Sequence, residues 1–218
     1  MNYIKNNYIN WIILLLGITI LGLGNSLIVI ANCGSDSITI FGQGIANTLS
    51  IKYGYAYIVA NLFFFIIVLI FHRKKIGIGT VASAFLTGLL INLYMKILPF
   101  STPDNIILKY TISLSGIVVV AIGVALYMYS NTGLGSFEGV VDLLTTKTKL
   151  RFWIIKICFD LILFISGILL GGTFGPVSVL SVFTLGPLID LFRFLLKKTN
   201  IIKEHKEENK LETEDLLS

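Results

Sequence analysis

Long, almost uncharged apolar stretches constrain this chain more than any other feature of its sequence. A helix needs about 20 mostly apolar residues to cross a bilayer, and six stretches meet that requirement. Only 13% of the 218 residues are charged, whereas soluble domains average about 25%, so a soluble fold would expose large apolar patches. The expected spans are Ile9–Ala31, Tyr53–Phe71, Ile76–Met95, Tyr110–Tyr129, Phe152–Leu170 and Gly175–Leu196. The sequence therefore predicts an all-α, polytopic transmembrane helical bundle.

Two further segments, Ser35–Ser50 and Gly133–Thr148, are shorter and more polar than these spans. A helix of about 15 residues is about 22 Å long, which is less than the hydrocarbon core of about 30 Å. We expect about six spans plus two short, glycine-opened helices that are re-entrant or interfacial. If the short segments cross the bilayer instead, the chain has eight spans.

An internal repeat relates the two halves of the sequence at an offset of 99 residues. The matching pairs are Gly24 and Gly123, Asn32 and Asn131, Gly34 and Gly133, Ser37 and Ser136, Lys52 and Arg151, and Asn61 and Asp160. After a one-residue slip the pairs are Gly77 and Gly175, Phe85 and Phe183, Gly88 and Gly186, and Asn92 and Asp190. Such self-similarity predicts two pseudo-symmetric repeats, residues 1–98 and 106–198, joined by a linker, 99–105, and followed by a charged cytoplasmic tail, 199–218.

The distribution of cations distinguishes the two topologies only weakly. Six spans make the second half inverted and place Lys52, Lys96 and Lys109 outside; eight spans make the halves parallel and place Arg73, Lys74 and Lys75 outside. We favour six spans, because a compact cationic cluster in a short loop resists translocation more than scattered lysines do. Both topologies predict a multi-pass protein of the cell membrane with both termini in the cytoplasm.

The glycine-rich segments resemble the YczE/YitT group of bacterial membrane proteins. The residues that carry the resemblance are Asn131-Thr-Gly-Leu-Gly-Ser136 with Asp142, Asn32-Cys-Gly-Ser-Asp-Ser37, Gly77-Ile-Gly-Thr80, Gly88-Leu-Leu-Ile-Asn-Leu93 and Gly186-Pro-Leu-Ile-Asp-Leu191. The resemblance covers roughly residues 10–195 and implies the short branch, which lacks a soluble C-terminal domain. The family's Pro-Trp-Asp is replaced by Phe137-Glu138-Gly139, so the resemblance implies an architecture rather than an activity.

Polar residues at membrane depth are the candidate site, because each ionisable group there costs about 2.5–3.5 kcal/mol. The residues expected around a solute or ion cavity are Asp36, Ser37, Asn61, Ser136, Glu138, Asp142 and Asp160, with backbone turns at Gly34, Gly133 and Gly135. Simpler interpretations remain open. Asp160 can form a local ion pair with Lys156, Asp36 can cap a helix, and Asp190 can pair with Arg193.

Known catalytic and metal-binding motifs are missing from the sequence: it has no P-loop, no HExxH and no serine nucleophile elbow. We expect no enzyme activity, no metal and no cofactor. The net charge of +5 comes from short clusters beside apolar stretches, which argues against a nucleic-acid partner. The sequence favours a small transporter or channel-like protein that moves a small solute or ion. The alternative is a non-transporting partner or regulator of another membrane protein. The expected partners are the lipid bilayer and the unknown solute, and a homo-oligomer is left open.

Overall fold

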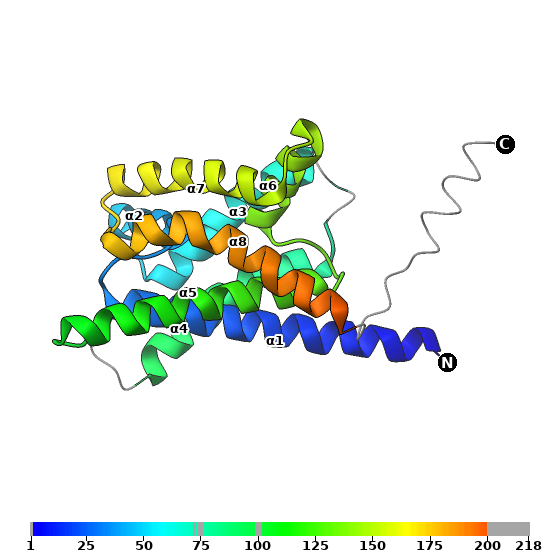
Figure 1. Ribbon diagram of the computed structural model, residues 1–218, viewed down its shortest axis with the longest axis horizontal. Coiled ribbons are helices and arrows are strands. Elements are labelled where there is room, and N and C mark those ends of the chain that lie inside the picture. The colour runs from blue at the N-terminus through cyan, green and yellow to red at the C-terminus, as the bar shows by residue number, and fades with distance from the viewer. Residues whose placement is uncertain (1, 72, 74–75, 99–101, 200–218) are drawn as a thin grey trace.

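Eight helices make up the part of the chain that the structure, a computed structural model, describes: residues 2–71, 73, 76–98 and 102–199 (Figure 1). No strand occurs in these ranges. The helices are α1 (Asn2–Ala31), α2 (Ser37–Leu49), α3 (Tyr53–Phe71), α4 (Ile78–Ile97), α5 (Ile106–Tyr129), α6 (Ser136–Thr148), α7 (Phe152–Leu169) and α8 (Pro176–Lys198). The expected all-α class is confirmed.

Six of these helices, α1, α3, α4, α5, α7 and α8, are long and apolar enough to cross a membrane. The polytopic bundle is therefore confirmed, although some bounds differ from the expected ones. Helix α5 begins at Ile106 rather than Tyr110, because the Asn105 side chain caps it by accepting a hydrogen bond of 2.9 Å from the Ile107 amide. Lys109 is tolerated inside this first turn because lysines near helix ends reach the interface.

The long helices α1 and α5 run antiparallel and in close contact (Figure 1), and they are the most buried of the six long helices. Glycines permit this approach: Gly17 faces Gly123, and Gly24 faces Gly116. A Cβ atom on Gly17 would lie 2.6 Å from the backbone nitrogen of Tyr127. Small residues at a crossing let two membrane helices pack backbone to backbone.

The two short helices lie at opposite ends of the bundle (Figure 1). Both α2 and α6 have 13 residues, and they begin 99 residues apart. A left-handed turn precedes each: φ is 47° at Asn32 and 114° at Gly34, and 53° at Asn131 and 125° at Gly133. Gly135, also expected as a turn, has φ −60° and is instead the N-cap of α6.

Each turn is held by a helix from the other half of the chain. In the first turn, the Ser35 amide donates to the Ser178 hydroxyl of α8 over 2.9 Å. In the second, the Gly79 amide of α4 donates to the Thr132 carbonyl, also over 2.9 Å. The two halves are thus interlocked rather than merely adjacent.

Helix α2 follows a path that turns back within the bundle, and this path is called re-entrant. Cys33 lies against Gly175, before the first residue of α8, whereas Ser37 lies farther inside, hydrogen-bonded to Asp160 in the middle of α7. The helix then runs outward, so that the Asn47 side chain donates to the Gly171 carbonyl in the α7–α8 turn. The chain therefore turns inward after α1 and leaves on the same side.

Helix α6 makes the corresponding excursion at the other end. Its turn contacts Gly77 and Gly79 at the start of α4, and its last turn places Lys147 over the Phe71 ring at the end of α3. Irregular backbone at membrane depth is stable only inside protein or beside a polar cavity, and the interlocked turns provide that protein environment.

Large apolar side chains cover the outer faces of the long helices, as expected for contact with lipid. Phe63 and Ile70 on α3, Ile162 on α7 and Phe183 on α8 are all at least half exposed. The tail beyond Thr199, the start of the linker at 99–101, and the cationic positions 74 and 75 lie outside the described residues.

Candidate functional site

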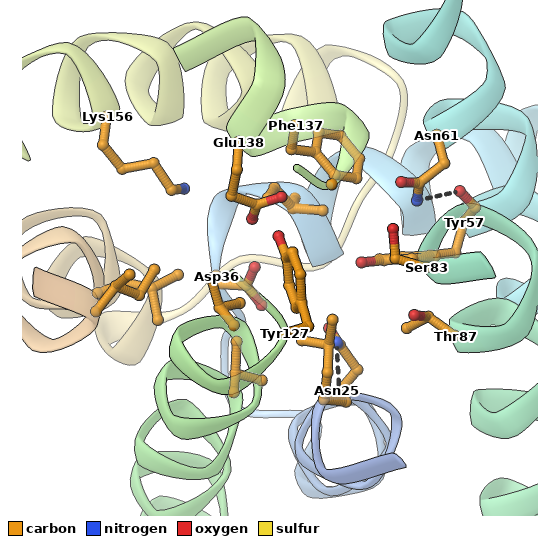
Figure 2. Close-up of a pocket in the computed structure, with 17 residues that line it drawn as sticks. Asn25, Asp36, Tyr57, Asn61, Ser83, Thr87, Tyr127, Phe137, Glu138 and Lys156 are labelled. Atoms are coloured by element: carbon orange, nitrogen blue, oxygen red, sulfur yellow. Dashed lines mark hydrogen bonds between the residues drawn. The ribbon is translucent and has the colours of Figure 1, made fainter. Parts of the chain in front are cut away.

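An internal cavity lies where the N-terminal ends of α2 and α6 approach the α1–α5 pair (Figure 2). Its volume of about 20 Å³ accommodates one or two water molecules. Seventeen residues line it. The polar ones among them are Asn25, Asp36, Tyr57, Asn61, Ser83, Thr87, Tyr127, Glu138 and Lys156.

Two carboxyl groups face this cavity from the ends of the two re-entrant helices. Asp36 is the N-cap of α2, and its side chain accepts from the Thr39 amide. Glu138 lies in the first turn of α6, with its Oε2 atom 2.5 Å from the position that a Cβ on Gly135 would take. The Glu138 carboxyl group thus lies over the N-cap position, where the first half has the Asp36 side chain. Helix N-termini favour negative groups at such positions.

The tyrosine hydroxyl of Tyr127 lies beside Glu138. Both oxygens are 2.5 Å from the same Cβ position on Gly135, and Figure 2 shows the Tyr127 ring pointing up from α5 between the two acids. Glycine is therefore required at position 135 by close approach, not by backbone conformation. Any side chain there would displace the carboxyl group and the hydroxyl.

A fully buried ion pair forms the third side of the site. The Lys156 ammonium lies 2.5 and 2.7 Å from the two Asp160 oxygens, and the Ser37 hydroxyl donates to Asp160 over 2.7 Å. Lys156 lines the cavity, and Asp160 lies behind it. The local pair that the sequence allowed is present, but it is in the interior of the bundle rather than at a boundary.

Neutral residues occupy the matching positions on the opposite wall. Tyr57 and Asn61 stand 99 residues before Lys156 and Asp160, and the Asn61 side chain donates to the Tyr57 carbonyl over 2.9 Å (Figure 2). Further pairs 99 or 98 residues apart also line the cavity from both halves. They are Leu21 and Val120, Asn25 and Val124, Asp36 and Gly135, Ile38 and Phe137, and Thr87 and Leu185.

Two buried hydroxyl groups near the re-entrant helices have no hydrogen-bond partner among the residues that the structure describes: Thr87 Oγ1, which faces the cavity, and Ser136 Oγ. Leaving such a group unpaired costs about 1–3 kcal/mol. A wall that combines an unpaired hydroxyl with two carboxyl groups is suited to a small polar ligand or to water.

The structure places the expected site residues in three groups. Asp36, Asn61 and Glu138 line the cavity. Ser37 and Asp160 are joined behind the wall, and Ser136 is buried at the start of α6. Asp142 lies on α6 one turn after Glu138; it is half-buried and does not line the cavity.

Several lining residues were not singled out from the sequence. Asn25, Tyr57, Ser83, Thr87 and Tyr127 all lie within apolar spans. Ser83 and Thr87 are four residues apart on α4, a spacing that puts both on one helix face. A search for such polar faces within the spans would have identified this pair.

Among the described residues, no group of three or more His, Cys, Asp or Glu side chains is placed to hold a metal ion. The boundary pair expected for Asp190 is present: its carboxyl oxygen lies 3.5 Å from Arg193, and both side chains are about one-third exposed.

Comparison with known proteins places the chain in a family. A family model described as a family of unknown function (DUF6198) matches residues 8–194. An uncharacterized protein of Haemophilus influenzae is 26% identical over 182 residues, which is 83% of this chain and 81% of that protein. No solved structure matches the chain. Because the family model covers nearly the whole helical bundle, the chain belongs to the DUF6198 family.

Proposed function

We propose that this protein is a small secondary transporter or channel-like protein, and that a small solute or ion passes through the cavity between the two re-entrant helices. One observation carries the proposal: the N-terminal ends of α2 and α6 enter from opposite ends of the bundle and bring Asp36 and Glu138 to one internal cavity. Broken helices that meet near the midplane are the binding-site architecture of many transporters.

The arrangement of helices supports a repeat of inverted topology as part of this proposal. The matching helices α1 and α5 are antiparallel, and the positive-φ residues Asn32, Gly34 and Ser50 recur 99 residues later at Asn131, Gly133 and Lys149. In this account six spans cross the cell membrane, both termini are cytoplasmic, and a pseudo-twofold axis in the membrane plane passes through the cavity.

The paired, glycine-opened turns also support a distant relationship with the YczE/YitT membrane proteins. The proposal makes the protein a carrier rather than an enzyme, since the polar groups around the cavity bind and orient without forming a nucleophile–base pair. The ionisable groups around the cavity are Asp36, Glu138 and the Lys156–Asp160 pair. When the two cavity carboxyl groups are ionised, the formal charge there is negative, which favours a cation.

Transport can be tested with the purified chain in proteoliposomes on a solid-supported membrane. Rapid jumps in pH, NaCl or KCl should produce charge movement for at least one of the three ions. The Glu138→Gln variant should lose most of this signal, because it removes a cavity carboxyl group. The Asp104→Asn variant, altered in the exposed linker, should retain it. If no jump produces more current than empty liposomes do, the transport proposal fails and a non-transporting role is favoured.

A further inference from the structure

Asp36 and a second acceptor compete for a single hydroxyl hydrogen. The Thr39 hydroxyl has one hydrogen, yet two oxygens lie within bonding distance as acceptors: Asn25 Oδ1 at 3.0 Å and Asp36 Oδ1 at 2.5 Å. A third group, the Tyr53 hydroxyl, donates to Thr39 over 3.2 Å. One hydrogen cannot serve both acceptors.

The orientation of Asn25 is fixed by a separate contact. Its amide nitrogen donates to the Leu21 carbonyl over 3.0 Å, so its oxygen faces Thr39 and must accept. Among these four groups, every hydrogen-bond requirement is met when Thr39 donates to Asn25 and Asp36 carries its own hydrogen, which it donates to Thr39. If Asp36 is ionised, the Thr39 hydrogen turns to the carboxylate, and the buried Asn25 oxygen loses the donor that the described residues give it and depends on cavity water.

We propose that Asp36 binds and releases a proton, and that the proton is the ion to which transport through the cavity is coupled. This inference rests on the proposed function. Asp36 is 2% exposed and lines a cavity with room for one or two waters. On release, the Asp36 O–H bond breaks and the proton passes to cavity water; on uptake, the same bond is remade. One positive charge therefore moves, and no electrons are transferred.

The same network connects the proton to the helices. Thr39 belongs to the re-entrant α2, and Asn25 belongs to the central α1. When the proton leaves, the Thr39 hydroxyl rotates from Asn25 to Asp36, and the hydrogen bond between these two helices is lost. Release of the proton thus loosens α2 from α1, which is a structural link between protonation and movement of the re-entrant helix.

Other charged and titratable groups face Asp36 from every side of the site. Lys156 and Asp160 on α7 interact with it electrostatically, as do Tyr53 and Tyr57 on α3. Glu138 on α6 and Tyr127 on α5 line the same cavity. Lys156 is held by Asp160 in this arrangement, so it does not neutralise Asp36 by direct contact.

Infrared spectroscopy of the full-length chain in proteoliposomes tests the proton site directly. The difference spectrum between low and high pH should contain a C=O stretch from a carboxyl group shielded from water, at a higher frequency than the stretch of the exposed acids, and Asp36→Asn should abolish that band. The Asp104→Asn control should leave it intact. Since the Asn side chain can donate to Thr39 as the protonated acid does, Asp36→Asn should also keep the thermal stability of the parent chain.

Flux measurements separate this inference from the proposed function. Proton flux, followed with an internal pH dye, should fall at least tenfold in Asp36→Asn and remain unchanged in Asp104→Asn. A carboxyl band that persists in Asp36→Asn would overturn the inference, as would Na⁺-driven flux that ignores the pH gradient. If Asp36→Asn abolishes the band while the parent chain carries no flux, the proton site stands and the transport proposal fails.

Discussion

Removing Lys156 should destabilise the protein strongly, because it leaves the Asp160 carboxyl group in the interior with Ser37 as its one remaining hydrogen-bond partner among the described residues. Both side chains of this pair are at most 1% exposed. Breaking a buried ion pair by deleting one partner costs about 3–5 kcal/mol. At about 2–4 °C per kcal/mol for a chain of this size, Lys156→Met should lower the melting temperature in detergent by about 6–20 °C.

A second substitution should reverse most of this loss. In the Lys156→Met/Asp160→Asn variant no charge remains unpaired, and the Asn side chain can still accept from Ser37; the matching position in the first half already has Asn61. Arg193→Met is the control, because its pair with Asp190 spans 3.5 Å and is about one-third exposed, so it should cost about 1 kcal/mol or less. The reasoning is wrong if Lys156→Met matches this control, or if the double variant is no more stable than the single one.

Three further predictions concern the backbone and the topology. Gly133→Ala should lower the melting temperature more than Gly171→Ala does. Both glycines have positive φ, but a Cβ on Gly133 would lie 2.6 Å from the Gly77 nitrogen, whereas a Cβ on Gly171 would have nothing within 4 Å. Equal decreases in melting temperature would contradict this. Gly17→Ala should lower the melting temperature by forcing α1 from α5, because its Cβ would lie 2.6 Å from the backbone nitrogen of Tyr127. An unchanged melting temperature would contradict this. A reporter fused after Lys75 should be cytoplasmic and one fused after Thr102 external; labelling of position 75 only from outside would favour eight spans.

Much of the fold follows from the sequence because the bilayer imposes simple rules on length and polarity. Helix α3 has the bounds expected from its apolar stretch. The expected start of α5 at Tyr110 is wrong because Lys109 interrupts the apolar stretch, whereas the capping Asn105 sets the start of the helix at Ile106. The short helices were found because their polar residues cannot face lipid, but their re-entrant path depends on contacts with α4 and α8.

The candidate site was only partly predictable. Ionisable residues are rare in an apolar sequence, so Asp36, Glu138 and Asp160 could be predicted as site residues. Asn25, Ser83 and Thr87 could not, because single polar residues in membrane spans often form hydrogen bonds within their own helix. Asn25 does so through its side-chain amide, which donates to the Leu21 carbonyl. Glu138 and Asp142, four residues apart, share one face of α6, and only Glu138 lines the cavity because it lies in the first turn of the helix, one turn closer to the cavity.

Access to the cavity from both sides of the membrane is the most direct test of the central claim. A Thr87→Cys variant, made in a chain with Cys33→Ala and Cys158→Ala, puts one thiol in the cavity wall. If the cavity opens alternately to each side, a small membrane-impermeant thiol reagent should modify this position when applied from either side, and modification from one side should block the other. A thiol that stays unmodified from both sides in a variant of unchanged thermal stability would contradict the account.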